Sequence, residues 1–157
     1  VRQAVSEFHA VEHRLELVNA VNGVTFYNDS KATNVDATIK ALESFPGNIH
    51  IILGGKDKGS DYTVLVPLLR ERVKAAYLIG AAAEKIRSQI QGSTTLVSAG
   101  TLERAVHQAF EVAKPGDIVL LAPACASFDQ FENYEQRGRI FKELVHALAP
   151  VITGDRR

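Results

Sequence analysis

The sequence predicts an α/β domain built on a mostly parallel sheet of about six strands, with helices on both faces and an antiparallel N-terminal hairpin at one edge. Short apolar runs with little polar alternation recur along the chain, as expected for strands that are buried on both faces. Helical patterns separate these runs. Near the amino end, Asn22-Gly23 lies between two apolar runs, and this dipeptide accepts the positive φ angles of a type I′ turn.

The local patterns place each element in turn. The hairpin strands are expected at 15–21 and 24–27, further strands at 49–53, 75–79, 94–97 and 118–121, and helices at about 34–44, 62–72, 81–90, 101–113 and 130–148. Thr101 can cap the fourth helix, and Lys114-Pro115-Gly116-Asp117 ends it with a turn. Pro67 lies inside the second helical pattern and leaves its exact limits open. This alternation of strand and helix predicts a Rossmann-like sheet.

The composition is that of one ordinary globular domain. The chain has 157 residues, of which 46% are hydrophobic and 23% are charged, and this length can bury a sizeable core. Because 18 basic residues balance 18 acidic ones, no net charge favours nucleic acid or a membrane surface. No apolar stretch approaches the roughly 18 residues that a membrane helix needs. We therefore expect no nucleic acid and no membrane as partners, and we expect a monomer.

The beginning of the chain suggests a piece of a longer protein. Methionine is absent, even at position 1, so no natural start codon is expected there. We expect residues 1–12 to be the end of a linker or helix from an upstream region, 13–150 to form the domain, and 151–157 to form a tail. No secretory leader is visible, and the single cysteine, Cys125, cannot form an internal disulfide. A reducing, cytoplasmic setting is therefore expected.

Three polar loops, at 28–34, 54–61 and 123–129, each follow an apolar run directly. Open α/β sheets bind ligands at the carboxyl ends of their strands, where loops and helix N-termini present backbone N–H groups. Helix starts near Asn34 and Asp129 would supply such groups. The sequence therefore predicts that the three loops form one site for a polar ligand.

Several common kinds of site are disfavoured. The chain contains neither a Gly-x-x-x-x-Gly-Lys-Ser/Thr phosphate loop nor a Gly-x-Gly-x-x-Gly dinucleotide motif. Its single cysteine excludes the paired-cysteine spacing of many zinc sites, and no metal site is expected within this chain. Ser127 lacks the Gly-x-Ser-x-Gly elbow of a hydrolase nucleophile. A phosphate-gripping loop would have to come from elsewhere.

Four motifs occur in a recognisable order along the chain. They are Asn28-Asp29-Ser30-Lys31-Ala32-Thr33-Asn34, Gly54-Gly55-Lys56-Asp57-Lys58-Gly59, the segment 123–131, and Glu135-Gln136-Arg137-Gly138. This set resembles the C-terminal domain of the Mur ligase family, and the resemblance runs from about His13 to the end of the last helix. Sibling branches carry His-x-Pro, Asn-Pro or Asp-Asn-Pro-Arg elements, which are absent here. The resemblance is therefore to the branch that adds D-glutamate.

The resemblance implies an ATP-dependent, ADP-forming ligase of cytoplasmic peptidoglycan synthesis. Such an enzyme adds D-glutamate to UDP-N-acetylmuramoyl-L-alanine through an acyl phosphate and a tetrahedral intermediate. It has three domains, of which the first holds the UDP-sugar and the central one carries the phosphate loop, the Mg²⁺ ligands and a carbamylated lysine. The third, which this chain resembles, closes over them. The chain alone is therefore expected to be inactive.

The resemblance also implies roles for individual residues around ATP. Arg14 and Asp29 would contact the nucleotide, and Lys31 would lie near its phosphates or the acyl phosphate as a catalytic charge. These residue types suit a nucleotide. A guanidinium stacks on a base or grips a phosphate, a carboxylate accepts from ribose hydroxyls, and an ammonium offsets charge on a transferred phosphoryl group.

D-glutamate would be held by a second set, which comprises Thr33, Lys58, Ser127, the backbone of Phe128 and the ring of Tyr134. A lysine, hydroxyls and helix-start N–H groups can satisfy both carboxylates without burying an unpaired charge. Some relatives have Phe at the place of Tyr134 and Leu at that of Phe128. Lys58 is preferred to Lys56 as the carboxylate contact.

Each of these candidate site residues, taken alone, could also have an ordinary structural role instead of a role in ligand binding. Arg14 and Lys58 could be solvated charges, Asp29 and Thr33 turn or cap residues, and Tyr134 a core residue. Two other functions stay open. The chain could belong to another amino-acid ligase of the superfamily, such as a folylpolyglutamate or cyanophycin synthase relative, or it could be a free-standing module that binds a small molecule.

Overall fold

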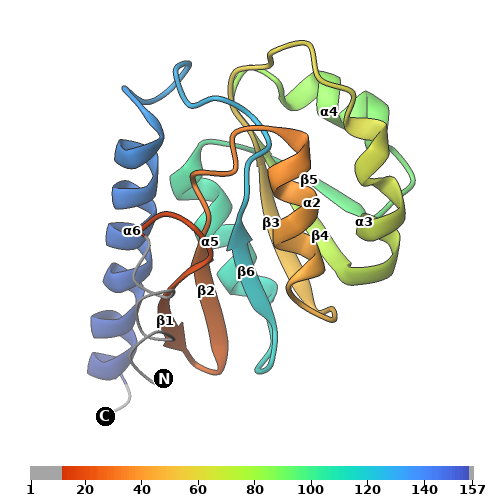
Figure 1. The fold of residues 1–157 in the computed structure, drawn as a ribbon. Helices are drawn as coiled ribbons and strands as arrows, with labels where there is room; N and C mark the ends of the chain where they lie inside the picture. Colours follow the sequence, from red (N-terminus) through yellow and green to blue (C-terminus); the bar gives the residue numbers. More distant parts are fainter. Residues whose placement is uncertain (1–11, 156–157) are drawn as a thin grey trace, which may run out of the picture.

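The computed structural model describes residues 12–155 and contains one six-stranded sheet. The strands are β1 (Glu16–Val21), β2 (Val24–Asn28), β3 (Ile49–Gly54), β4 (Val73–Ile79), β5 (Thr95–Gly100) and β6 (Ile118–Leu121). Their order across the sheet is β1-β2-β6-β3-β4-β5 (Figure 1). Only the β1–β2 pair is antiparallel. The predicted fold class, a mostly parallel sheet with an antiparallel hairpin edge, is confirmed.

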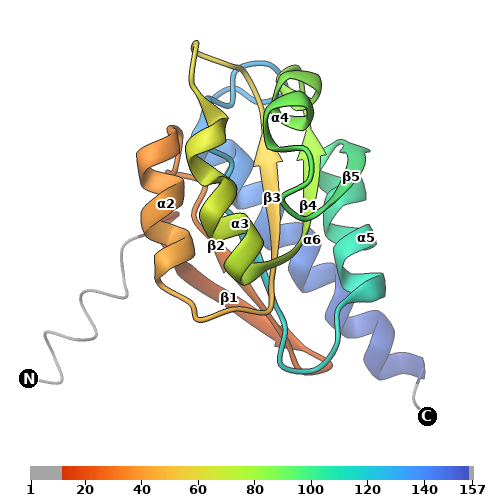
Figure 2. The ribbon, with the colours of Figure 1, turned by 90° about the vertical axis from the view of Figure 1, so that its right-hand side faces the viewer.

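Helices cover both faces of the sheet. They are α2 (Val35–Glu43), the 3₁₀ turn η1 (Tyr62–Leu65), α3 (Val66–Arg72), α4 (Ala83–Ile90), α5 (Leu102–Val112) and α6 (Tyr134–Asp155). Figure 2 shows α2, α3 and α4 on one side and α5 and α6 on the other. A separate apolar core fills each side. Because both faces are covered, β3 is buried at every position and carries the continuous apolar pattern of a central parallel strand.

The hairpin forms where the sequence predicts it. Asn22 and Gly23 have φ angles of 53° and 83°, the left-handed values that a type I′ turn requires at both central positions. Val21 pairs with Val24 across this turn. The turn thereby sets the pairing of β1 with β2, and β2 pairs in parallel with β6 on its other side.

Two predicted helices differ from the observed ones. The helix expected at 62–72 is divided into η1 and α3, with Pro67 in the first turn of α3, where the missing N–H of proline costs no helical hydrogen bond. The helix start expected near Asp129 is wrong. The N–H groups of Gln130 and Phe131 both donate to the carbonyl of Ser127, so this segment forms turns before α6 begins at Tyr134 and continues to Asp155.

The proposed division into domains stays a prediction. The linker assigned to residues 1–12 lies outside the described residues except for Glu12. Among the helices of the described part, none combines the length and apolar character needed to cross a bilayer.

Candidate functional site

Three neighbouring strands deliver the predicted polar loops to one edge of the sheet. β6 pairs in parallel with β2 on one side and β3 on the other, so their carboxyl ends lie next to one another (Figure 1). The backbone joins the loops there. Asp29 N donates to Leu121 O at 2.8 Å, Ala124 N to Ala32 O at 2.9 Å, and Lys56 N to Ala126 O at 2.8 Å. The three loops therefore form one continuous surface, as the sequence predicts.

Arg137 in α6 donates hydrogen bonds to two of these loops, the one at 28–34 and the one at 123–129. Its side chain is fully buried. Nε donates to Ser30 Oγ at 2.9 Å, Nη2 to Ser30 O at 2.8 Å and Nη1 to Cys125 O at 3.1 Å. Burial lowers the pKa of the guanidinium to about 10, which leaves it charged at neutral pH. Sequence reasoning gave Arg137 no role, although it lies within one of the recognised motifs.

The first cavity holds the residues predicted to contact ATP. It has a volume of about 530 Å³ and is lined by Arg14, Asp29 and Lys31, together with one side of α2 from Asp36 to the C-cap Ser44. Asp29 is buried, and this burial raises the pKa of its carboxyl to about 6, against the opposing effects of the Leu15 N–H and the Arg14 charge. Hydroxyl donors of a ligand would offset that desolvation. The residue types therefore fit a nucleotide.

The second cavity holds every residue predicted to contact D-glutamate. Its volume is about 350 Å³, and Thr33, Lys58, Ser127, Phe128 and Tyr134 all line it. Ser127 is buried, whereas the Phe128 side chain is 65% exposed at the rim. Lys56 is not among the lining residues. The geometry therefore favours Lys58 over Lys56 as the cation of this cavity.

Lys31 and Tyr134 connect the two cavities. Lys31 Nζ donates to the Tyr134 hydroxyl at 3.2 Å and lies 5.0 Å from the centroid of the ring. Lys31 lines the first cavity and Tyr134 lines the second. The contact therefore crosses the wall between them.

Asp57 shapes the loop that carries Lys58. Its carboxylate accepts from Lys85 Nζ at 2.9 Å, from the Tyr62 hydroxyl at 2.7 Å and from Gly59 N at 3.1 Å. These partners, Lys85 first, hold the pKa of Asp57 well below its usual range. The loop is thus anchored to α4 and η1 by a charged residue whose role the sequence did not reveal.

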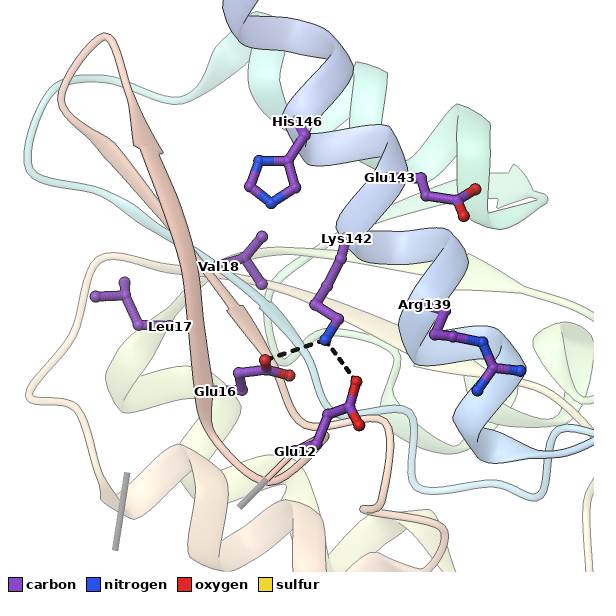
Figure 3. A pocket seen from close by; sticks show the side chains of 8 residues that line it. All are labelled: Glu12, Glu16, Leu17, Val18, Arg139, Lys142, Glu143 and His146. Carbon is purple, nitrogen blue, oxygen red and sulfur yellow. Dashed lines mark hydrogen bonds and ion pairs between the residues drawn. The ribbon is translucent and has the colours of Figure 1, made fainter. Parts of the chain in front are cut away.

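A cluster of possible metal ligands lies elsewhere, between α6 and β1. One ligand atom each from Glu12, His13 and Glu16 falls within 4.8 Å of the others. Lys142 already occupies the carboxylates: its Nζ donates to Glu12 at 2.8 Å and to Glu16 at 3.1 Å, as Figure 3 shows. The Lys142 ammonium therefore already neutralises the carboxylates that a metal ion would need.

The state of His13 also argues against a metal there. Ser30 N donates to Asn28 Oδ1 at 3.1 Å, which orients the Asn28 amide so that Nδ2 donates to His13 Nδ1 at 2.9 Å. A neutral ring that accepts at Nδ1 carries its proton on Nε2, and burial lowers the pKa of His13. Since Nε2 holds a proton, it offers a metal no lone pair. These residues instead join α6 to the start of β1.

Comparison with known proteins agrees with this architecture. Residues 13–125 match the family model described as "Mur ligase, glutamate ligase domain". The chain therefore belongs to the Mur ligase family, to which its sequence motifs are similar.

Relatives with close sequence similarity carry one name. A protein of Acidobacterium capsulatum named "UDP-N-acetylmuramoylalanine--D-glutamate ligase" is 65% identical over 147 residues, covering 94% of this chain and 32% of the relative. A protein of Koribacter versatilis with the same name is 66% identical over 149 residues, covering 95% of this chain and 33% of the relative. The chain thus spans about a third of the length of these relatives.

Solved structures support the fold. The Escherichia coli protein FolC, in complex with DHPP and ADP, aligns with a TM-score of 0.61 at 18% identity, covering 88% of this chain and 32% of that one. The bifunctional folylpolyglutamate synthase/dihydrofolate synthase of Yersinia pestis gives a TM-score of 0.59 at 19% identity, covering 88% and 31%. At these identities the likeness concerns the fold alone.

Proposed function

We propose that this chain is the C-terminal domain of an ATP-dependent, ADP-forming ligase that adds D-glutamate to UDP-N-acetylmuramoyl-L-alanine in cytoplasmic peptidoglycan synthesis. One observation carries the proposal. The residues that the motifs assign to ATP line one cavity, and those assigned to D-glutamate line the neighbouring one. The name shared by the relatives supports this choice over another amino-acid ligase.

In the amino-acid cavity, charge and donors match a small dicarboxylate. Lys58 would pair with one carboxylate, while the hydroxyls of Thr33 and Ser127 and the N–H of Phe128 would donate to the other. The Tyr134 ring would cover the aliphatic stem. The exposed Phe128 side chain leaves the rim open for closure against the rest of the enzyme.

In the nucleotide cavity, Asp29 would accept from ribose hydroxyls, and Arg14 would stack on the base or grip a phosphate. ATP supplies the phosphoryl group that converts the substrate carboxylate to an acyl phosphate. Lys31 would face the point where that group meets the incoming amine and would offset the charge on it. We assign Mg²⁺ chiefly to other parts of the full-length enzyme, since the acidic cluster of this chain already binds Lys142.

The full-length enzyme that carries this chain provides the test. We expect ADP release only when UDP-N-acetylmuramoyl-L-alanine and D-glutamate are both present, and no turnover by the isolated 157-residue chain, which we propose acts as a monomeric part of the enzyme. A panel of amino acids serves as the control. Activity with another amino acid in place of D-glutamate would contradict the proposed substrate. Turnover by the isolated chain would contradict the proposal that catalysis needs other parts of the full-length enzyme.

A further inference from the structure

The Lys31 ammonium has a neutral partner, unlike three lysine ammonium groups of the described residues that pair with carboxylates. Lys74, Lys85 and Lys142 each pair with a carboxylate at 2.8–2.9 Å. Lys31 Nζ instead donates to the Tyr134 hydroxyl. Within the described part of the chain, no carboxylate oxygen lies within 4.0 Å of it. Its charge therefore remains available to an anionic ligand.

Tyr134 has contacts of its own to the loop and to His13. Its carbonyl accepts from Ser30 Oγ at 2.7 Å, and Ser30 Oγ accepts from the buried Arg137 Nε at 2.9 Å. The His13 ring meets the Tyr134 ring edge-on at a centroid distance of 6.1 Å. A chain of hydrogen bonds thus runs from the buried guanidinium through Ser30 to the backbone of Tyr134, and the His13 ring borders its side chain.

We propose that Tyr134 is a positioning residue, whose hydroxyl and ring hold the Lys31 ammonium on the wall between the two cavities, ready for an anion in either one. This inference rests on the proposed function, which gives each cavity its ligand. It adds a role for the hydroxyl that is separate from covering the glutamate stem.

The physical advantage lies in the weakness of a neutral partner. A phosphoryl or carboxylate oxygen makes a stronger, charge-assisted hydrogen bond to an ammonium than a phenol does, so a ligand displaces Tyr134 without breaking an ion pair. Holding the ammonium beforehand also reduces the side-chain entropy lost when the ligand binds. Tyr134→Phe keeps the cation–π contact but removes the directional partner.

The first test follows the Lys31 ammonium directly in this chain by ¹⁵N NMR of lysine side chains. We expect Tyr134→Phe to shift the Lys31 Nζ resonance and speed its proton exchange. Tyr27→Phe is the matched control, since Tyr27 packs on Phe45 with ring centroids 4.8 Å apart and lines neither cavity. An unchanged Lys31 signal in Tyr134→Phe would overturn the proposal.

The second test measures kinetics in the full-length enzyme. Loss of one hydrogen bond predicts that Tyr134→Phe lowers kcat about three- to tenfold, while KM for D-glutamate changes by less than about twofold because the ring remains. The Tm should stay that of the wild type. A wild-type kcat in the variant would contradict the positioning role. Inactive wild-type enzyme would instead refute the proposed function, and the ammonium measurement would still decide whether Tyr134 holds Lys31.

Discussion

Arg137 is a fully buried charge whose side chain, among the residues that the structure describes, donates only to neutral oxygens of Ser30 and Cys125. Lysine has the same charge but cannot reproduce the planar fork of a guanidinium. We expect Arg137→Lys to lower the free energy of unfolding by about 1–3 kcal/mol, because carbonyl groups would lose their donors. Urea denaturation measures this loss.

Arg139, an exposed residue of the same helix, gives the control. Arg139→Lys should change the free energy of unfolding by less than about 0.5 kcal/mol. Equal losses in the two variants would show that the fork of Arg137 contributes nothing beyond its charge.

Asp29 makes stability depend on pH in an unusual direction for a carboxylate. Burial raises its pKa from 3.8 to about 6 in the folded chain, so the folded state binds the proton more tightly than the unfolded state does. The contribution of Asp29 to stability is therefore fully present below pH 3.8 and is lost as pH rises through about 6.

Asp29→Asn removes this titration. We expect the variant to be more stable than the wild type by about 1–2 kcal/mol at pH 7 and to lose that advantage near pH 4. Urea denaturation at pH 7 and at pH 4 measures the difference in unfolding free energy between variant and wild type. The other titrating groups contribute equally to both proteins, so their effect cancels in this difference. A stability gain of the same size at both pH values would contradict the assigned cause.

The loops depend on close approach between backbones. Gly55 has a φ of 139°, and an added Cβ would collide with the carbonyl of Ala126, next to the paired hydrogen bonds of Lys56 and Ala126. Gly59, in the same loop, has a φ of 84° and open space around it. Both glycines have a positive φ, but only Gly55 is crowded by another backbone segment. Comparing substitutions at the two positions therefore distinguishes the cost of the backbone conformation from the cost of the steric clash.

We expect Gly55→Ala to cost more than about 2 kcal/mol of unfolding free energy and Gly59→Ala about 1 kcal/mol. Denaturant unfolding of both variants provides the comparison. If Gly59→Ala costs as much as Gly55→Ala, the approach of the loops after β3 and β6 is not what requires Gly55.

Elements with local signals could be predicted from the sequence. Asn22-Gly23 identifies the hairpin because the turn needs those residues, and Thr101 caps α5 by accepting from Arg104 N at 3.3 Å. The sequence prediction places the start of α6 too early, although this start has a local signal. Asn133 Oδ1 accepts from Gln136 N at 2.8 Å, a bond typical of an N-cap asparagine, while the preceding turns donate to Ser127 O. Pro67 indicated that the helical pattern at 62–72 is interrupted, but it did not reveal that the segment divides into η1 and α3.

The candidate site shows the same limit. The resemblance named eight residues that line the two cavities. Six of them lie in the three loops at the ends of strands, whereas Arg14 precedes β1 and Tyr134 begins α6. The motifs did not reveal that Arg137 is buried beneath those loops, nor that Lys31 meets Tyr134, because 103 positions separate that pair. Such contacts arise only when the sheet brings distant segments together.

The whole molecule places its chemistry at one end. Two apolar cores fix the sheet between its helical layers, and the adjacent β2, β6 and β3 bring their loops together at the edge where both cavities lie (Figures 1 and 2). The central claim is that the cavity containing Lys58 receives D-glutamate. It can be tested without the rest of the enzyme.

The most direct measurement is a proton–nitrogen NMR titration of this chain with D-glutamate, with L-glutamate and ATP as separate controls. We expect D-glutamate at millimolar concentration to shift Thr33, Lys58, Ser127 and Phe128 selectively. The same shifts should vanish in Lys58→Met and persist in Lys56→Met. Shifts that survive in Lys58→Met, or none with D-glutamate in the wild-type chain, would contradict a preformed amino-acid site in this domain.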